Sequence, residues 1–171
     1  MLDHAAAEAL AGLHEAGIDF VSGLPDGWQR NLHELVEADP AIQYVPVCNE
    51  GVGFSVCAGA WLGGKRPAAL IENFGLFASA YHLLRGNISY GIPTLIVTEY
   101  RGDGGDQEFF SESGEVTEPF LSAMRVNYRV VRELPLLKAA IRDGLRWMDF
   151  ALRPYAVVPG FDLTRLRKRN A

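Results

Sequence analysis

The chain has 171 residues, of which 49% are hydrophobic and 22% are charged. This length and composition predict one well-buried domain, residues 1–171, and leave too little chain for two ordinary domains. The net charge of −5 argues against a nucleic-acid platform, and the lack of a long apolar run or a leader pattern argues against a membrane protein, so we expect a cytoplasmic protein.

Helical and strand patterns alternate along the chain. The first half predicts strands at residues 19–22, 43–47 and 68–72 and helices at 3–16, at 28–38 and from about residue 50. The second half predicts strands at residues 94–98, 128–131 and 155–158 and helices at 77–89 and 134–148. Alternation of this kind is typical of a parallel sheet covered on both faces. We therefore expect an α/β fold with an open, mostly parallel sheet and helices on both faces.

Two segments fall outside this alternation. Residues 101–118 are rich in glycine and acidic residues, which predicts a loop or lid with little core of its own. Residues 163–171 contain four basic side chains and read as a basic, solvated tail. Binding of an acidic partner surface is the alternative role of that tail.

The two cysteines stand in apolar surroundings. Cys48 is in a predicted strand and Cys57 is in a predicted helix, where cysteine usually serves as a small buried hydrophobe. Neither a CxxC motif nor a Cys/His cluster is present in the sequence, so no structural zinc site is expected.

Glu50 stands where an apolar strand runs into a helix of small residues. The junction of strand ends and helix starts is the usual ligand crevice of an open α/β sheet. The alternative role is a charge partner for the helix N-terminus, which contributes about 0.3 to 1 kcal/mol. Gly51 and Gly53 each lower helix propensity by about 1 kcal/mol, which favours the close approach of a cofactor ring. For Ala58 and Gly59 we expect tight packing on the sheet instead.

Four segments carry a resemblance to a known family. They are Gly23-Leu24-Pro25-Asp26, then Asn49-Glu50-Gly51, then Glu72-Asn73-Phe74-Gly75-Leu76, and lastly Ile92-Pro93-Thr94 leading to Tyr100-Arg101-Gly102. In this order and spacing, over roughly residues 15 to 160, the chain resembles the pyrimidine-binding domain of thiamine-diphosphate enzymes. It is most similar to the sulfopyruvate and phosphonopyruvate decarboxylases.

The resemblance implies a role for several of these residues. In such enzymes a glutamate, here Glu50, bonds the N1′ nitrogen of the aminopyrimidine and favours the tautomer that activates the thiazolium carbon. A buried carboxylate suits this sharing of a proton with a ring nitrogen. The cofactor-binding residues implied are Glu50, Gly51, Asn73, Gly75 and Leu76.

A second motif points to a metal site that we reject. Gly102-Asp103-Gly104 with Asn127 looks like the signature that holds magnesium and diphosphate in the other half of these enzymes. However, Val126 precedes Asn127, and Tyr100-Arg101-Gly102 aligns with a loop of the pyrimidine domain. We therefore expect no metal on this chain. The magnesium and the diphosphate of the cofactor would lie on a partner subunit, so that the chain is the α subunit of a hetero-oligomer and inert alone.

Departures from the family pattern concern the substrate. Phe77, Phe109 and Phe110 stand where the family has more polar residues, which makes the pocket more apolar and less cationic. A larger or more apolar 2-oxo acid, or a carboligation acceptor, would fit better there than a sulfonate or phosphonate. The alternative is that Phe109 and Phe110 anchor a lid. Pro25 and Asp26 are further substrate-pocket candidates, although Pro-Asp-Gly is also an ordinary turn sequence.

Three functions remain open. The first is a thiamine-diphosphate-dependent decarboxylase or carboligase subunit acting on a 2-oxo acid. The second is a catalytically silent structural or regulatory partner, and the third is a flavodoxin-like nucleotide binder. The sequence predicts that His33 and His82 are surface or interface residues, and that Arg101 orients its loop by pairing with acidic side chains.

Overall fold

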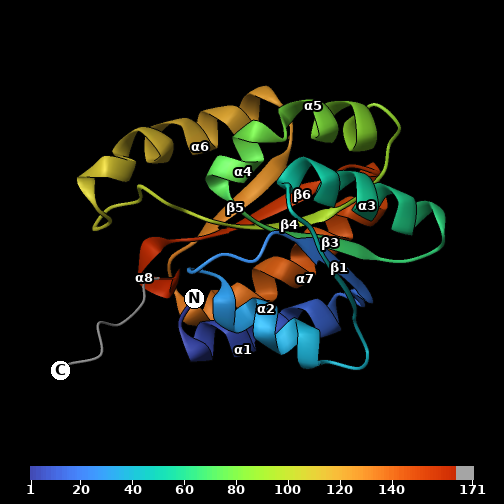
Figure 1. The fold of residues 1–171 in the computed structure, drawn as a ribbon, viewed down its shortest axis with the longest axis horizontal. Helices are drawn as coiled ribbons and strands as arrows, with labels where there is room; N and C mark the ends of the chain where they lie inside the picture. The colour runs from blue at the N-terminus through green and yellow to red at the C-terminus, as the bar shows by residue number, and fades with distance from the viewer. Residues whose placement is uncertain (165–171) are drawn as a thin grey trace.

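The computed structural model describes residues 1–164 and shows a six-stranded sheet with helices on both faces (Figure 1). All strands are parallel, in the order β2-β1-β3-β4-β6-β5, which confirms the predicted fold class. The strands are β1 (Phe20–Gly23), β2 (Gln43–Pro46), β3 (Pro67–Glu72), β4 (Leu95–Glu99), β5 (Asn127–Val131) and β6 (Tyr155–Pro159).

Two layers of helices cover the sheet. One face carries α1 (Asp3–Glu15), α2 (Arg30–Ala38) and α7 (Leu134–Ala151) (Figure 1). The opposite face carries α3 (Glu50–Leu62), α4 (Asn73–Ala78), α5 (Ala80–His82), the π-helix η1 (Leu83–Ile88) and α6 (Ser111–Ala123). The short helix α8 (Phe161–Thr164) follows β6, and it was not predicted. Within the described part of the chain, no helix combines the length and the apolar character needed to cross a bilayer.

The core lies on both faces of the central strands. Leu70 and Val97 point into the layer of α1 and α7, whereas Ile71 and Ile96 point into the layer of α3 and α4. All four side chains are fully buried. Strands buried on both faces read as continuous apolar runs, which is why β3 and β4 were predictable from the sequence.

The predicted loop at residues 101–118 is largely helical. A 3-10 turn, η2 (Glu108–Phe110), leads into α6, so only the residues before 108 are irregular. Of the glycines that suggested a loop, Gly102 and Gly114 serve close packing, because a Cβ atom on Gly114 would overlap the backbone of Gly102. Gly104 and Gly105 lie in the irregular part before residue 108. The hydroxyl of Ser113 donates to the carbonyl of Phe110 at 2.6 Å and closes the first turn of α6.

Three smaller expectations need correction. Cys57 is buried as predicted, but Cys48 is exposed because it lies after the end of β2. Gly59 does not pack on the sheet, since it lies on the outer side of α3 with open space where a side chain would be. The helix expected at 77–89 begins earlier, at Asn73. Of the predicted basic tail, residues 163 and 164 belong to α8, and residues 165–171 lie outside the described residues.

Candidate active site

The candidate site lies at the carboxyl ends of β1 and β3, beside the N-terminus of α3. After β1 the chain turns to α2 on one face, and after β3 it turns to α4 on the other face (Figure 1). Two adjacent parallel strands whose connections leave in opposite directions open a crevice between them, which is where open α/β sheets bind ligands. Glu50 starts α3 at this crevice.

The first turn of α3 is capped in a way that places Glu50. The side chain of Asn49 accepts hydrogen bonds from the backbone N–H of Gly51 at 2.9 Å and of Val52 at 3.3 Å. This N-cap satisfies amide groups that have no partner within the helix. Glu50 is half-buried, and within residues 1–164 its carboxylate has no hydrogen-bond or ion-pair partner. A free acceptor therefore stands at the positive end of a helix.

Gly75 provides the surface on which the Glu50 side chain rests. A Cβ atom on residue 75 would overlap Cγ, Cδ and Oε1 of Glu50. The absence of a side chain at this position of α4 lets the carboxylate lie directly against the helix backbone. The two residues are 25 positions apart in the sequence, and the structure brings them into contact.

Gly51 has a different role from the one expected. The space left by its missing side chain is filled by the imidazole of His82, because a Cβ atom there would overlap the ring. It is therefore not an open surface for a cofactor ring. His82 is half-buried, and its Nδ1 atom is buried with no hydrogen-bond partner among the described residues. At Gly53 an added Cβ atom would make only ordinary contacts, the nearest at 3.4 Å from Val47.

Two other predicted cofactor residues support the wall of the crevice. Asn73 is fully buried, and its amide donates to the carbonyl of Arg101 at 3.0 Å and to the hydroxyl of Thr117 at 2.8 Å. These bonds tie the end of β3 to α6. Leu76 is also fully buried and belongs to the core under α4. Both side chains are thus committed to the protein, apart from the Asn73 Oδ1 atom, which has no partner in the described chain.

Glu72 and Glu99 end the neighbouring strands β3 and β4 and pair in register. Neither was predicted as a site residue from the sequence. Burial, followed by the charges of Asp26 and Glu72, raises the pKa of Glu99 to about 10, so that this fully buried carboxyl group is neutral at pH 7. Burial and the charge of Asp26 also raise the pKa of Glu72, whereas the charge of Arg101 lowers it. In the sequence, an acidic residue at the end of each of two apolar strands could have indicated these two positions.

Arg101 holds the loop after β4 over the crevice. Its side chain is only 2% exposed and forms ion pairs from Nε to Asp106 at 2.8 Å and from Nη1 to Glu72 at 3.3 Å. Its guanidinium carbon lies 3.9 Å from the ring centre of Trp28 and 3.6 Å from that of Phe110. The prediction that Arg101 orients this loop by charge pairing is confirmed for Asp106.

The predicted aromatic residues form a line beside the crevice. Phe77 contacts Phe74 edge-on with ring centres 6.4 Å apart, and Phe74 contacts Phe110 in the same way at 5.8 Å. Phe109 packs on Phe110 at 5.1 Å but is 85% exposed. Phe110 is therefore an anchor of the loop, whereas Phe109 projects outward.

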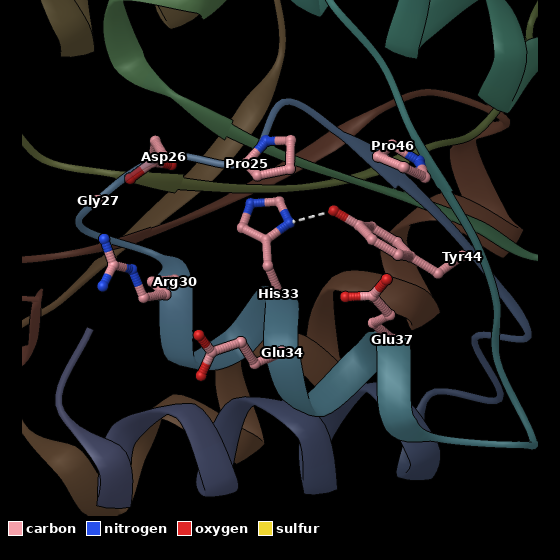
Figure 2. A pocket seen from close by; sticks show the side chains of 9 residues that line it. All are labelled: Pro25, Asp26, Gly27, Arg30, His33, Glu34, Glu37, Tyr44 and Pro46. Atoms are coloured by element: carbon pink, nitrogen blue, oxygen red, sulfur yellow. Dashed lines mark hydrogen bonds between the residues drawn. The ribbon is translucent and has the colours of Figure 1, made fainter.

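The turn that contains Pro25 and Asp26 serves two purposes. Asp26 Oδ1 accepts from the backbone N–H of Trp28 at 2.6 Å and of Gln29 at 2.8 Å, as in an ordinary turn. Its Oδ2 atom is buried and has no partner in the described residues. Pro25 and Asp26 line a pocket beside α2 (Figure 2). His33 also lines this pocket and is only 4% exposed. Of the two roles predicted for it, surface residue is therefore wrong, and interface residue stays a prediction.

The rejected magnesium motif is not assembled in space. Asp103 Oδ1 pairs with Arg132 at 2.7 Å, and its Oδ2 accepts from the backbone N–H of Phe161 at 3.3 Å. Asn127 begins β5 at the amino end of the sheet, beside Tyr155. Asp103 follows β4 at the carboxyl end. The two residues therefore cannot share one ion.

Comparison with known proteins places the chain in a family. No protein-family model matches it. It is 38% identical over 123 residues to the sulfopyruvate decarboxylase subunit alpha of Methanothermobacter thermautotrophicus, covering 71% of this chain and 74% of that protein. It is 36% identical over 181 residues to the phosphonopyruvate decarboxylase of Streptomyces viridochromogenes, covering 97% of this chain but only 44% of that enzyme.

A solved structure agrees with the observed fold. The 2-oxoglutarate:ferredoxin oxidoreductase from Magnetococcus marinus matches with a TM-score of 0.75 and 18% identity, over 96% of this chain and 29% of that chain. At this identity the match supports the fold alone. The sequence match to the sulfopyruvate decarboxylase alpha subunit, supported by the match to the phosphonopyruvate decarboxylase, shows that the chain belongs to the family of sulfopyruvate and phosphonopyruvate decarboxylases.

Proposed function

We propose that the chain is the pyrimidine-binding α subunit of a split, thiamine-diphosphate-dependent 2-oxo acid decarboxylase. The observation that carries this proposal is the Glu50 carboxylate, which lies half-buried at the N-terminus of α3, rests on Gly75, and has no partner within residues 1–164. Relatives named as alpha subunits support the expectation of a second subunit.

The residues at the crevice fit the aminopyrimidine half of this cofactor. Glu50 offers an unpaired carboxylate to a ring nitrogen, and Gly75 leaves room for that carboxylate to lie flat against α4. When bound, thiamine diphosphate supplies the nucleophilic carbon that adds to a 2-oxo group and holds the electrons left by carbon dioxide. The task of Glu50 is to hold a proton shared with the ring nitrogen and to take it back within each turnover.

The charges of the crevice bear on the substrate. Burial and then the charge of Asp26 raise the pKa of both Glu72 and Glu99, and Glu99 is held neutral at pH 7. Of the cations near them, Arg101 is already engaged by Asp106 and Glu72. The Met1 ammonium group faces Glu99 and Asp26, and burial lowers its pKa. A doubly charged sulfonate or phosphonate would find little compensation here, since burying an unpaired charge is costly. A 2-oxo acid with an uncharged side chain fits these surroundings better.

The diphosphate and its magnesium ion are assigned to the partner subunit. Asp103 and Asn127, which could have offered such a site, lie at opposite ends of the sheet. The chain alone should therefore bind thiamine diphosphate weakly or not at all, as measured by calorimetry. Tight, magnesium-dependent binding by this chain alone would contradict the division of the site between two subunits.

Substitution of Glu50 by glutamine tests the proposal directly. In the complex with a diphosphate-binding partner, Glu50→Gln should lower the rate of carbon dioxide release from a 2-oxo acid by about 100-fold or more, because the amide cannot share the proton. Glu115→Gln, at an exposed position of α6, should leave the rate unchanged. If Glu50→Gln assembled normally and kept its rate, Glu50 would not be the acid that activates the cofactor.

A further inference from the structure

A second cavity lies on the other side of the turn at residues 25–27. It has a volume of about 410 Å³ and opens between this turn, α2 and the end of β2 (Figure 2). Its polar lining residues are Asp26, Arg30, His33, Glu34, Glu37 and Tyr44. Glu50 does not belong to this lining. Asp26 is the residue that the cavity shares with the crevice, since its charge also acts on Glu72 and Glu99.

The inner wall of the cavity carries a buried histidine, His33, and only one of its two ring nitrogens has a hydrogen-bond partner among the described residues. The Nδ1 atom of His33 lies 2.7 Å from the hydroxyl of Tyr44. Its Nε2 atom is buried and has no partner among the described residues. Figure 2 shows this edge of the ring facing the turn that carries Pro25 and Asp26. Leaving such a buried group without a hydrogen bond destabilises the folded state, so a bonding partner at this position would stabilise the protein.

The protonation of the pair follows from its surroundings. Burial lowers the pKa of His33, and the charge of Asp26 raises it by a smaller amount. The net direction is downward, so the ring is neutral at pH 7. Burial, with the charges of Glu37 and Asp26, raises the pKa of Tyr44 to about 12, so the phenol keeps its proton. A neutral imidazole has one N–H donor and one acceptor nitrogen.

Only one tautomer satisfies Tyr44. The phenol oxygen has no other partner within residues 1–164. If the O–H of Tyr44 donates to Nδ1 of His33, the ring proton is on Nε2 and the phenol is satisfied. If Nδ1–H were the donor, the phenolic proton would have no acceptor, which is unfavourable in a partly buried position. His33 therefore presents an Nε2–H donor toward the turn.

An unpaired acceptor lines the same cavity. Asp26 Oδ2 is buried without a partner in the described chain. A group that accepts from His33 and also donates to Asp26 must carry both a lone pair and a proton. A hydroxyl group does so, whereas a carboxylate only accepts and an ammonium group only donates. One water molecule could make the same bonds, but it occupies about 30 Å³ in the liquid, and the cavity is far larger.

The mouth of the cavity determines which hydroxyl compounds fit. Arg30, Glu34 and Glu37 lie around it and form no ion pair within the described residues (Figure 2). With Asp26 this makes three carboxylates against one guanidinium, a formal charge of −2 with His33 neutral. We propose that the cavity binds a small amino alcohol, whose hydroxyl group bonds His33 and Asp26 and whose ammonium group faces Glu34 and Glu37. Phosphate esters are excluded by the same charges.

Titration of the purified chain with matched small molecules tests this site without any assay of turnover. The probes are ethanolamine and 2-amino-1,3-propanediol, with ethylamine and phosphoethanolamine as comparisons, followed by ¹⁵N NMR of the His33 ring. The two amino alcohols should bind saturably and shift the Nε2 resonance, whereas ethylamine and phosphoethanolamine should bind at least tenfold more weakly. Equal affinity for ethanolamine and ethylamine, or no saturable shift, would overturn the proposal.

Variants separate the roles of the wall and the mouth. Tyr44→Phe removes the group that selects the tautomer and should weaken ethanolamine binding at least tenfold. Glu34→Gln and Glu37→Gln, both at exposed positions, should each weaken it several-fold with unchanged thermal unfolding. Glu115→Gln on α6 is the control and should bind as the wild type does. Undiminished binding in the Glu34, Glu37 double variant would show that the ammonium group is not held as proposed.

Discussion

Glu50 of α3 lies directly against Gly75 of α4, with no room for a side chain at residue 75. The contact joins the start of one helix to the first turns of another, and it lies beside the crevice between β1 and β3. Glycine at this position does not serve a turn, because residue 75 is within α4 and its φ is not positive. Its function is to leave space for the carboxylate.

Gly75→Ala should therefore displace Glu50 while changing the fold little. The added Cβ atom overlaps a side chain that has to move, so we expect turnover of the assembled enzyme to fall at least tenfold. Gly59→Ala is the control, because open space surrounds that position of α3, and the alanine should raise the free energy of unfolding by about 0.5 to 1 kcal/mol. Normal turnover in Gly75→Ala would show that the position of Glu50 against Gly75 is not needed.

Arg101→Met should cause a large loss of stability. The variant leaves Asp106, whose side chain is 1% exposed, without its cation, and breaking a buried ion pair in this way costs about 3 to 5 kcal/mol. Urea unfolding measures the change. Arg66→Met, which breaks an exposed pair with Asp149, should cost less than about 1 kcal/mol.

The double variant Arg101→Met, Asp106→Asn distinguishes charge from packing. Removing the unpaired carboxylate should restore part of the free energy of unfolding that Arg101→Met loses, since the effects of neighbouring substitutions are not additive. No recovery would mean that the stacking of Arg101 between Trp28 and Phe110 stabilises the loop, and that the ion pair contributes little.

The sequence was sufficient to predict the sheet and the position of Glu50 at the start of a helix, for physical reasons. Strands β3 and β4 are buried on both faces, so their apolar runs are continuous. Glu50 instead follows the edge strand β2, where a short apolar run leads into a helix of small residues. The helix α6 was missed because its glycine and hydroxyl residues are those of a loop. Only the tertiary structure shows that Gly114 is small in order to approach Gly102.

Contacts between distant residues could not be predicted. His82 fills the space beside Gly51, and His33 is buried under the turn at Asp26, but nothing local in either helix distinguishes these histidines from surface ones. The pairing of Glu72 with Glu99 depends on the register of β3 against β4, which the sequence alone does not determine.

Glu99 should make the stability of the protein depend on pH. Its pKa is about 10 in the folded state and about 4.3 in the unfolded chain. Between these values the folded state retains a proton that the unfolded state has released, so this group favours unfolding increasingly as the pH rises, by up to about 1.4 kcal/mol per pH unit. Glu99→Gln removes this dependence. Its free energy of unfolding should exceed that of the wild type by more at pH 8 than at pH 5.

Urea unfolding at pH 5, 6.5 and 8 tests this expectation. The comparison is between the slopes of stability against pH, so a constant packing effect of the amide cancels. Parallel curves for the two proteins would mean that Glu99 is ionised in the folded state, with its charge compensated by a neighbour.

Phe109 and Phe110 should differ in their effects although they are adjacent. Phe110 stacks on Arg101 and contacts Phe74, so Phe110→Ala should lower the melting temperature measurably. Phe109 is 85% exposed, so Phe109→Ala should leave the melting temperature of the isolated chain nearly unchanged. We expect Phe109 to pack over the bound substrate in the assembled enzyme, where its ring would exclude water from the reacting carbon. Phe109→Ala should then lower turnover, or raise the share of aldehyde relative to carboligation product. An unchanged rate and product ratio would show that Phe109 has no part in closing the site.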